Sequence, residues 1–201
     1  MLSHRPKKTT IDPDFLLLAY CSGYFPMADP ETGEIGWYSP DPRAIIDLSE
    51  FKIPRSLRAT VRKSLFEIRL NQRFQDVLRA CADRKETWIS KDVVDSYVKL
   101  HTLGYAHSVE CWKDDRLVGG LYGVAIGGAF FGESMFSRVR DASKLALVHL
   151  VTRLRERGYE LLDTQFLTPH LARFGAREIP RKEYLARLKT ALRKKCQFTL
   201  S

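Results

Sequence analysis

The stretch ELLDTQFL, residues 160–167, decides the fold prediction, because it places two polar side chains inside a short apolar run. Apolar pairs flank Asp163 and Gln165, a pattern typical of a short buried strand. Burying a carboxylate without partners costs free energy, so these two residues need a reason to be there. Side chains two residues apart on a strand point to one face, so we expect Asp163 and Gln165 to share a face, with Thr164 opposite.

The segments around this stretch indicate a sheet covered by helices. Residues 141–158 carry an apolar helical stripe, with Asp141 or Ser143 as the cap and Gly158 as the end. Before it, residues 106–112 and 117–127 form two strand-like runs joined by an Asp-rich turn, which predicts a β-hairpin. Residues 128–137 add a third strand, and TPHLARFGA, which follows the opening stretch, begins another helical piece.

In the N-terminal half, the sequence patterns for secondary structure are shorter and more often interrupted by turn residues. A short helix should begin at Asp12 or Asp14 and end at Gly23. Residues 28–46 are rich in Pro, Gly and Asp and predict turns at a domain boundary. Residues 74–103 predict two helical pieces, of which the second begins after the N-cap Ser90.

The order of these elements predicts an α+β fold with a mixed, mainly antiparallel sheet flanked by helices. We expect a small N-terminal domain at residues 1–40 and a main domain at residues 41–201. The chain has 201 residues and 44% hydrophobic content, which suffices for one core, or for one domain with a small appendage.

Composition and apolar runs indicate where in the cell the protein would act and whether it would bind metal. No apolar run approaches the roughly 18 residues needed to span a bilayer, and MLSHRPKKTT lacks the features of a secretory signal. We therefore expect a cytoplasmic protein without a membrane partner. The four cysteines are scattered and the histidines lack metal-ligand spacing, so we expect reduced thiols and no metal site.

The formal net charge of +9 and the pI of about 9.5 favour a polyanionic partner, most commonly nucleic acid. Basic residues gather at 181–195 and again at Arg55, Arg58, Arg62 and Lys63. A solvated face of an amphipathic helix explains the first cluster about as well as a phosphate-contacting surface does.

A helix followed by a strand, after several antiparallel strands, resembles the core of the GNAT acyltransferases. Those enzymes bind the coenzyme A pyrophosphate on a Gly-rich loop at the start of the central helix. In this chain the segment that leads into the corresponding helix is SRVRDASKLA, which has no glycine, and Asp141 adds negative charge there. The sequence therefore disfavours an ordinary acyl-CoA enzyme.

Several longer motifs carry a more specific resemblance: GYFPM, WYSPDPR, TWIS, LVGGLYGVAIGG, GESMFSRVRDASKLAL and LLDTQFLTPHLARFGAREIPRKEYL. With these motifs, the chain from about Phe15 to Leu188 closely resembles the leucyl/phenylalanyl-tRNA–protein transferases. The resemblance implies a GNAT-like acyltransferase domain preceded by a small N-terminal domain. It also implies transfer of Leu or Phe, and less well Met, from Leu-tRNA or Phe-tRNA to proteins with N-terminal Arg or Lys. The product would carry a degradation signal. No cofactor and no metal are implied, and we expect a monomer.

The resemblance also assigns the polar residues. Gln165 would contact the acceptor α-amine, Asp163 would polarise it or bind the acceptor, and Glu133 would bind a cationic acceptor side chain. An amide is a poor base, so Gln165 should mainly position the amine, and whether Asp163 transfers a proton stays open. The residues alone allow a structural alternative, in which Asp163 pairs with an arginine and Gln165 satisfies backbone groups. Glu133 has a similar alternative, a structural hydrogen bond to a turn.

Four apolar residues match positions that line the aminoacyl pocket in the family, although each is compatible with plain core: Leu121, Phe130, Met135 and Leu150. Trp88 and Met27 match positions at the 3′-terminal adenosine, where an aromatic face stacks on a base. Met27 stands where better-known members have tryptophan, and Leu121 replaces a methionine of similar volume. These departures leave the donor preference open.

Three alternatives remain beside the main interpretation. One is the same reaction with another donor or acceptor preference, for example acidic N-termini. Another is a non-catalytic tRNA-binding module with the GNAT-like fold, against which the retained Asp163, Gln165 and Glu133 argue. The third is an acyl-CoA N-acyltransferase, which the glycine-free helix entry weakens.

Overall fold

The strand expected at the opening stretch lies inside a seven-stranded sheet with the order β4-β5-β6-β7-β8-β3-β9. This computed structural model describes residues 10–63, 65–84 and 87–199. Only β7 and β8 pair in parallel, and the other neighbours in the sheet are antiparallel. The strands of this sheet are β3 (Arg43–Ile46), β4 (Glu67–Leu70), β5 (Ala106–Lys113), β6 (Arg116–Ile126), β7 (Ala129–Ser137), β8 (Leu161–Gln165) and β9 (Ala176–Ile179).

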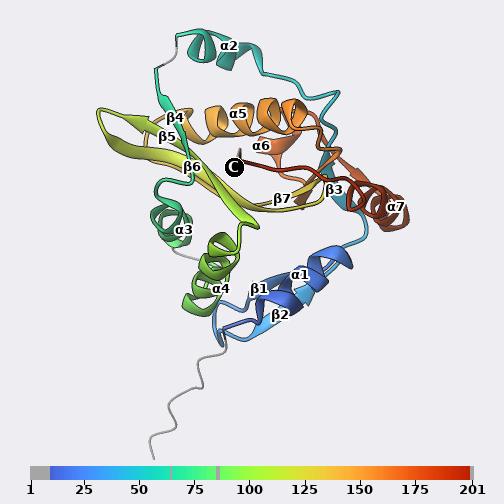
Figure 1. The fold of residues 1–201 in the computed structure, drawn as a ribbon. Helices are drawn as coiled ribbons and strands as arrows, with labels where there is room; N and C mark the ends of the chain where they lie inside the picture. The colour runs from blue at the N-terminus through green and yellow to red at the C-terminus, as the bar shows by residue number, and fades with distance from the viewer. Residues whose placement is uncertain (1–9, 64, 85–86, 200–201) are drawn as a thin grey trace, which may run out of the picture.

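Helices cover both faces of the sheet (Figure 1). On one face the apolar stripe of α5 packs against the strands, and α3 and α4 cover the other face. The described helices are α1 (Pro13–Cys21), α2 (Arg55–Arg62), α3 (Phe74–Ala82), α4 (Lys91–Thr102), α5 (Ala142–Glu156), α6 (Pro169–Ala172) and α7 (Arg181–Ala191). The α+β prediction with a mixed, mainly antiparallel sheet is confirmed.

Several predicted helix boundaries are confirmed. The Asp12 side chain accepts from the N–H of Phe15 at the start of α1, and Ser90 caps α4 in the same way. Asp141 does precede α5, but its side chain makes no capping hydrogen bond, and it adopts a left-handed φ of 69°. Its carboxylate instead lies 2.5 Å from Nζ of Lys144, so Asp141 occupies the predicted N-cap position without making a capping hydrogen bond.

The segment predicted as turns, residues 28–46, holds more order than expected. Asp29 forms a tight turn by accepting from the N–H groups of Glu31 and Thr32. This turn joins β1 (Phe25–Ala28) to β2 (Ile35–Tyr38) in a separate two-stranded sheet, and β3 begins at the end of the same segment. The first nine residues of the predicted N-terminal domain lie outside the described residues.

Two bulges shape the sheet where β7 and β8 meet. On β7, Gly132 pairs with Gly123 and Ser134 pairs with Tyr122, so Glu133 is an extra residue without a partner on β6. A Cβ on Gly123 would lie 2.2 Å from the carbonyl oxygen of Phe131, so this close approach requires glycine. Bulges re-aim side chains and occur often beside active sites.

The second bulge lies on β8, where Thr164 has no partner on β3 and Gln165 has a φ of 57°. The pairing of β7 with β8 begins at Ala129 and Leu161 and ends at Phe131 and Asp163. Both strands continue beyond this last pair. The two parallel strands therefore separate just after Asp163, at the level of both bulges.

Candidate active site

A cavity of about 280 Å³ occupies the gap between the separated ends of β7 and β8. Its walls come from both strands, from the N-terminal hairpin, from the segment before α4, from α5 and from the region of α6. The lining residues are Phe25, Met27, Arg84, Trp88, Gly132, Glu133, Ser134, Met135, Leu147, Thr164, Gln165, Phe166, Thr168, His170 and Leu171. Most of this wall is apolar, with one carboxyl group and one amide at its inner end.

Glu133 is that carboxyl group, and the bulge turns it into the cavity instead of into the sheet ladder. The hydroxyl of Tyr97 donates to its Oε2 at 3.0 Å, and Tyr20 in turn hydrogen-bonds to Tyr97. Burial raises the pKa of Glu133 to about 7, against the opposing effect of the tyrosine hydrogen bonds and with the help of the nearby Asp163 charge. At neutral pH this carboxyl group can therefore both hold and release a proton.

Gln165 joins Glu133 at the inner end of the cavity. Its Nε2 donates to Oε1 of Glu133 at 3.4 Å, and its backbone N–H donates to Oδ1 of Asp163 at 2.9 Å. The expectation that Thr164 faces away from Gln165 is wrong, because both residues line the cavity. The bulge and the left-handed backbone break the two-residue alternation on which that expectation depended.

Asp163 lies behind the cavity wall and is 0% exposed. Nε and Nη2 of Arg43 donate to its two oxygens at 2.9 and 2.6 Å, and the hydroxyl of Tyr184 donates to Oδ2 at 2.7 Å. With the N–H of Gln165, this carboxylate accepts four hydrogen bonds. The structure thus shows the arginine pairing that the sequence left open. Asp163 is not among the residues that line the cavity, and its expected contact with the acceptor stays a prediction.

Arg43 is the residue that the sequence reasoning missed. Its guanidinium lies between the rings of Phe25 and Tyr184, at 4.7 and 4.5 Å from their centroids, and it donates to the carbonyl of Gly23 at 3.1 Å. It therefore ties the N-terminal segment to β8 and α7. The available signal was a charged residue at the head of the apolar run RAII, where a buried cation needs an anion.

The predicted aminoacyl pocket is only partly at the cavity wall. Met135 lines it, but Leu121, Phe130 and Leu150 are at most 3% exposed, belong to the core cluster on the α5 side and are not among the lining residues. Leu147, one helical turn before Leu150, lines the cavity instead, although it too is only 2% exposed. The roles of these residues stay predictions.

The two residues expected at the 3′-terminal adenosine, Met27 and Trp88, both line the cavity. Across residues 10–63, 65–84 and 87–199, no three His, Cys, Asp or Glu side chains are grouped so that they could hold a metal ion. Among the helices the structure describes, none has the length and apolar content to cross a membrane.

The fold and the cavity define a class of protein: an α+β protein whose separated parallel strands enclose an apolar cavity that ends in a carboxyl–amide pair. Such a cavity suits a ligand with an apolar group and an amine. The family model of the leucyl/phenylalanyl-tRNA protein transferases matches residues 45–189, and the model of their N-terminal domain matches residues 9–41. The chain belongs to the leucyl/phenylalanyl-tRNA protein transferase family.

Curated relatives agree with this assignment, and each is named leucyl/phenylalanyl-tRNA–protein transferase. The relative from Gloeobacter violaceus is 54% identical over 94% of this chain and 98% of its own length. Those from Herpetosiphon aurantiacus and Phenylobacterium zucineum are 55% and 58% identical, over 90% and 88% of this chain and 95% and 82% of their own. Among solved structures, the C-terminal domain of a putative lysylphosphatidylglycerol synthetase from Agrobacterium fabrum aligns over 94% of this chain and 64% of its own, with 17% identity and a TM-score of 0.42.

Proposed function

We propose that this protein transfers leucine or phenylalanine, and methionine less well, from aminoacyl-tRNA to the α-amino group of proteins that begin with Arg or Lys. The new N-terminal residue would mark the acceptor for degradation. The observation that carries the proposal is the family match over nearly the whole chain, together with the cavity in which Glu133 and Gln165 meet an apolar wall. Along the chain, α5 connects β7 to β8, which are parallel and then separate. This arrangement supports a GNAT-like fold.

The reaction is aminolysis of an ester. The acceptor nitrogen attacks the ester carbonyl carbon, the bond from that carbon to the ribose oxygen breaks, and the ribose oxygen leaves with a proton. A free α-amine has a pKa of about 8 and needs little help to lose its proton. Once the neutral amine attacks, its nitrogen must lose a further proton as the new bond forms, and Glu133, with its pKa raised to about 7, is matched to accept this second proton.

Gln165 holds the amine beside Glu133, and the apolar wall receives the leucyl or phenylalanyl side chain. Asp163 acts through Gln165, since it fixes the backbone N–H of that residue and has no exposed surface. Trp88 and Met27 would hold the terminal adenosine at the outer wall. The protein would act as a monomer in the cytoplasm.

A transfer assay tests the proposal. Purified protein is mixed with tRNA charged with labelled Leu, Phe or Met and with peptides that begin with Arg, Lys, Asp or Glu. We expect label on the Arg and Lys peptides. Label on the Asp and Glu peptides alone would favour the alternative with acidic acceptors, and tRNA binding without any transfer would favour a binding module.

A further inference from the structure

A second hollow continues the cavity on the side of Arg84. It has a volume of about 440 Å³ and shares three wall residues with the cavity, namely Arg84, Met135 and His170. The remaining lining residues are Ala80, Asp83, Phe136, Ser137, Arg138 and Ser143. The two spaces therefore adjoin: the wall of the first is mostly apolar beyond the Glu133–Gln165 pair, and the wall of the second carries basic and hydroxyl groups.

Both arginines of this hollow are held by the protein itself. Nη2 of Arg84 donates to the carbonyl of Met135 and lies 3.4 Å from Oγ of Ser134. Arg138 donates to the carbonyl of Leu117 at 3.4 Å, and its guanidinium lies 5.5 Å from the centre of the Phe136 ring. Neither arginine forms an ion pair with a described carboxylate, so both keep their charge for an anion.

Asp141 is the nearby acid whose charge would repel an anion from this hollow, but it forms ion pairs with other residues. Asp141 precedes α5 close to this hollow, but it is not among the lining residues, and its carboxylate pairs with Lys144 at 2.5 Å and with Arg140 at 3.8 Å. Asp83 is the remaining acid of the wall, against two arginines. At the junction of the two spaces, Nε2 of His170 is buried and has no hydrogen-bond partner among the described residues, so it can bind a ligand there.

On these grounds, and resting on the proposed function, we propose that the hollow lined by Arg84, Arg138, Ser137 and Ser143 binds a ribonucleotide phosphate. It is the phosphodiester that precedes the 3′-terminal adenosine of the donor tRNA. With the aminoacyl group at the inner end and the adenosine at Trp88, the next phosphate leaves the cavity past Arg84. Arginine suits this task because its planar fork matches phosphate oxygens.

Two small donors isolate this contact: leucyl-adenosine, which has no phosphate, and the leucyl ester of cytidylyl-adenosine, which has one phosphodiester. In the unmodified protein we expect the added phosphodiester to raise kcat/KM by about tenfold or more, the usual effect of a charge-assisted contact. Arg138→Gln should bring the ratio of the two kcat/KM values close to one, and Arg138→Lys should restore part of it. Arg157→Gln, at the other end of α5, is the matched control and should keep the full ratio.

Three results would overturn the proposal: no advantage of the phosphodiester in the unmodified protein, an Arg138→Gln variant that keeps the full ratio, or an equal loss of the ratio in Arg157→Gln. Transfer from charged tRNA is measured in parallel with the unmodified protein. Its absence would instead overturn the proposed function, so the two failures are distinguishable.

Discussion

Glu133 stands at the one bulged position of β7, where a carboxyl group is turned away from the sheet and toward the cavity. Its pKa near 7 results from burial, held in check by the tyrosine hydrogen bonds. A carboxyl group that titrates near neutral pH is suited to accept a proton from an amine. At the scale of single residues, two predictions follow from this pKa.

The first concerns the pH dependence of transfer. If Glu133 must be ionised, the transfer rate rises with pH through about 7. Tyr97→Phe removes a donor that stabilises the anion, so the acidic limb should move up by about one pH unit. Tyr122→Phe is the control, because the Tyr122 hydroxyl has no hydrogen-bond partner among the described residues. The acceptor amine titrates identically in all variants, so an unmoved limb in Tyr97→Phe would exclude Glu133 as the titrating group.

The second concerns stability. The folded protein keeps the Glu133 proton up to a pH of about 7, whereas the unfolded chain releases it near the ordinary value of 4.5. The folded state binds more protons between these values, so its stability falls as the pH rises through this window. Above this pH window the full loss of stability caused by the raised pKa of Glu133 is present. Glu133→Gln should therefore raise the free energy of unfolding by about 1–3 kcal/mol at pH 8 and hardly at all at pH 4.5, while abolishing transfer. Urea unfolding at both pH values measures this difference, and equal effects at both would contradict it.

At the scale of elements, one ion pair joins β3, β8 and α7. Arg43 heads β3, Asp163 lies in β8, and Tyr184 on α7 donates to the same carboxylate. Because Asp163 also holds the N–H of Gln165, the pair connects the packing of these elements to the inner end of the cavity. Arg43 is not among the residues that line the cavity, so the arrangement makes it a positioning residue.

Removing one partner of this pair should be costly. Arg43→Met leaves a buried carboxylate without its cation and should destabilise the protein by about 3–5 kcal/mol. The double variant Arg43→Met/Asp163→Asn should cost clearly less than the sum of the two single variants, with a coupling of at least about 1 kcal/mol. The exposed pair of Arg187 and Glu183, at 2.8 Å, is the control and should show a coupling below about 0.5 kcal/mol. Additive costs at the buried pair would exclude the coupling.

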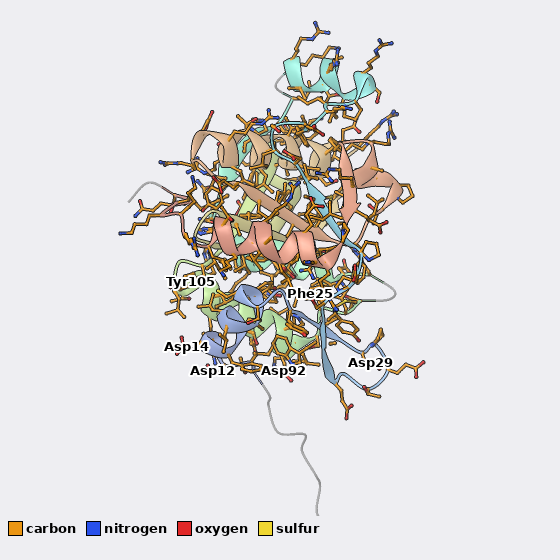
Figure 2. The ribbon with its side chains drawn as sticks, turned by 90° about the vertical axis from the view of Figure 1, so that its right-hand side faces the viewer. Asp12, Asp14, Phe25, Asp29, Asp92 and Tyr105 are labelled. Atoms are coloured by element: carbon orange, nitrogen blue, oxygen red, sulfur yellow. The ribbon has the colours of Figure 1, made fainter. Side chains whose placement is uncertain are left out.

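At the scale of the whole molecule, charge is unevenly placed. Figure 2 shows Asp12, Asp14, Asp29 and Asp92 together at the end of the molecule that carries the N-terminal unit, and α2 at the opposite end. The α2 segment carries the basic cluster that begins at Arg55, and its arginines are exposed. We expect this end, and not the acidic end, to contact the tRNA backbone.

Salt dependence tests this polarity. Binding of charged tRNA should weaken as the KCl concentration rises, because phosphate contacts release counterions. Arg62→Gln should weaken binding of Leu-tRNA and Phe-tRNA equally and lower the slope of log K against log salt by about one. Asp14→Asn, on the acidic end, should leave the slope as it is. An unchanged slope in Arg62→Gln would show that α2 is only a solvated face.

Much of this architecture follows from local patterns. Hydrophobic periodicity, caps and turn residues predicted α1, α4, α5, the β5–β6 hairpin and β8, because these signals act within a few residues of the chain. The family resemblance depended on motifs of the same local kind, and it assigned roles to Glu133, Asp163 and Gln165.

Long-range geometry decided the rest. The bulges at Glu133 and Thr164 arise from pairing with other strands, so no local period of two reveals which side chains share a face. Asp163 and Arg43 are 120 residues apart, and only the fold brings them together. The sequence by itself determined α1, α4, α5, the β5–β6 hairpin, β8 and the family, whereas β1 and β2 lie in a segment that it predicted as turns. The tertiary structure decided that Asp163 is a buried anchor and that Glu133 titrates near neutral pH, because partners and burial are properties of the folded chain.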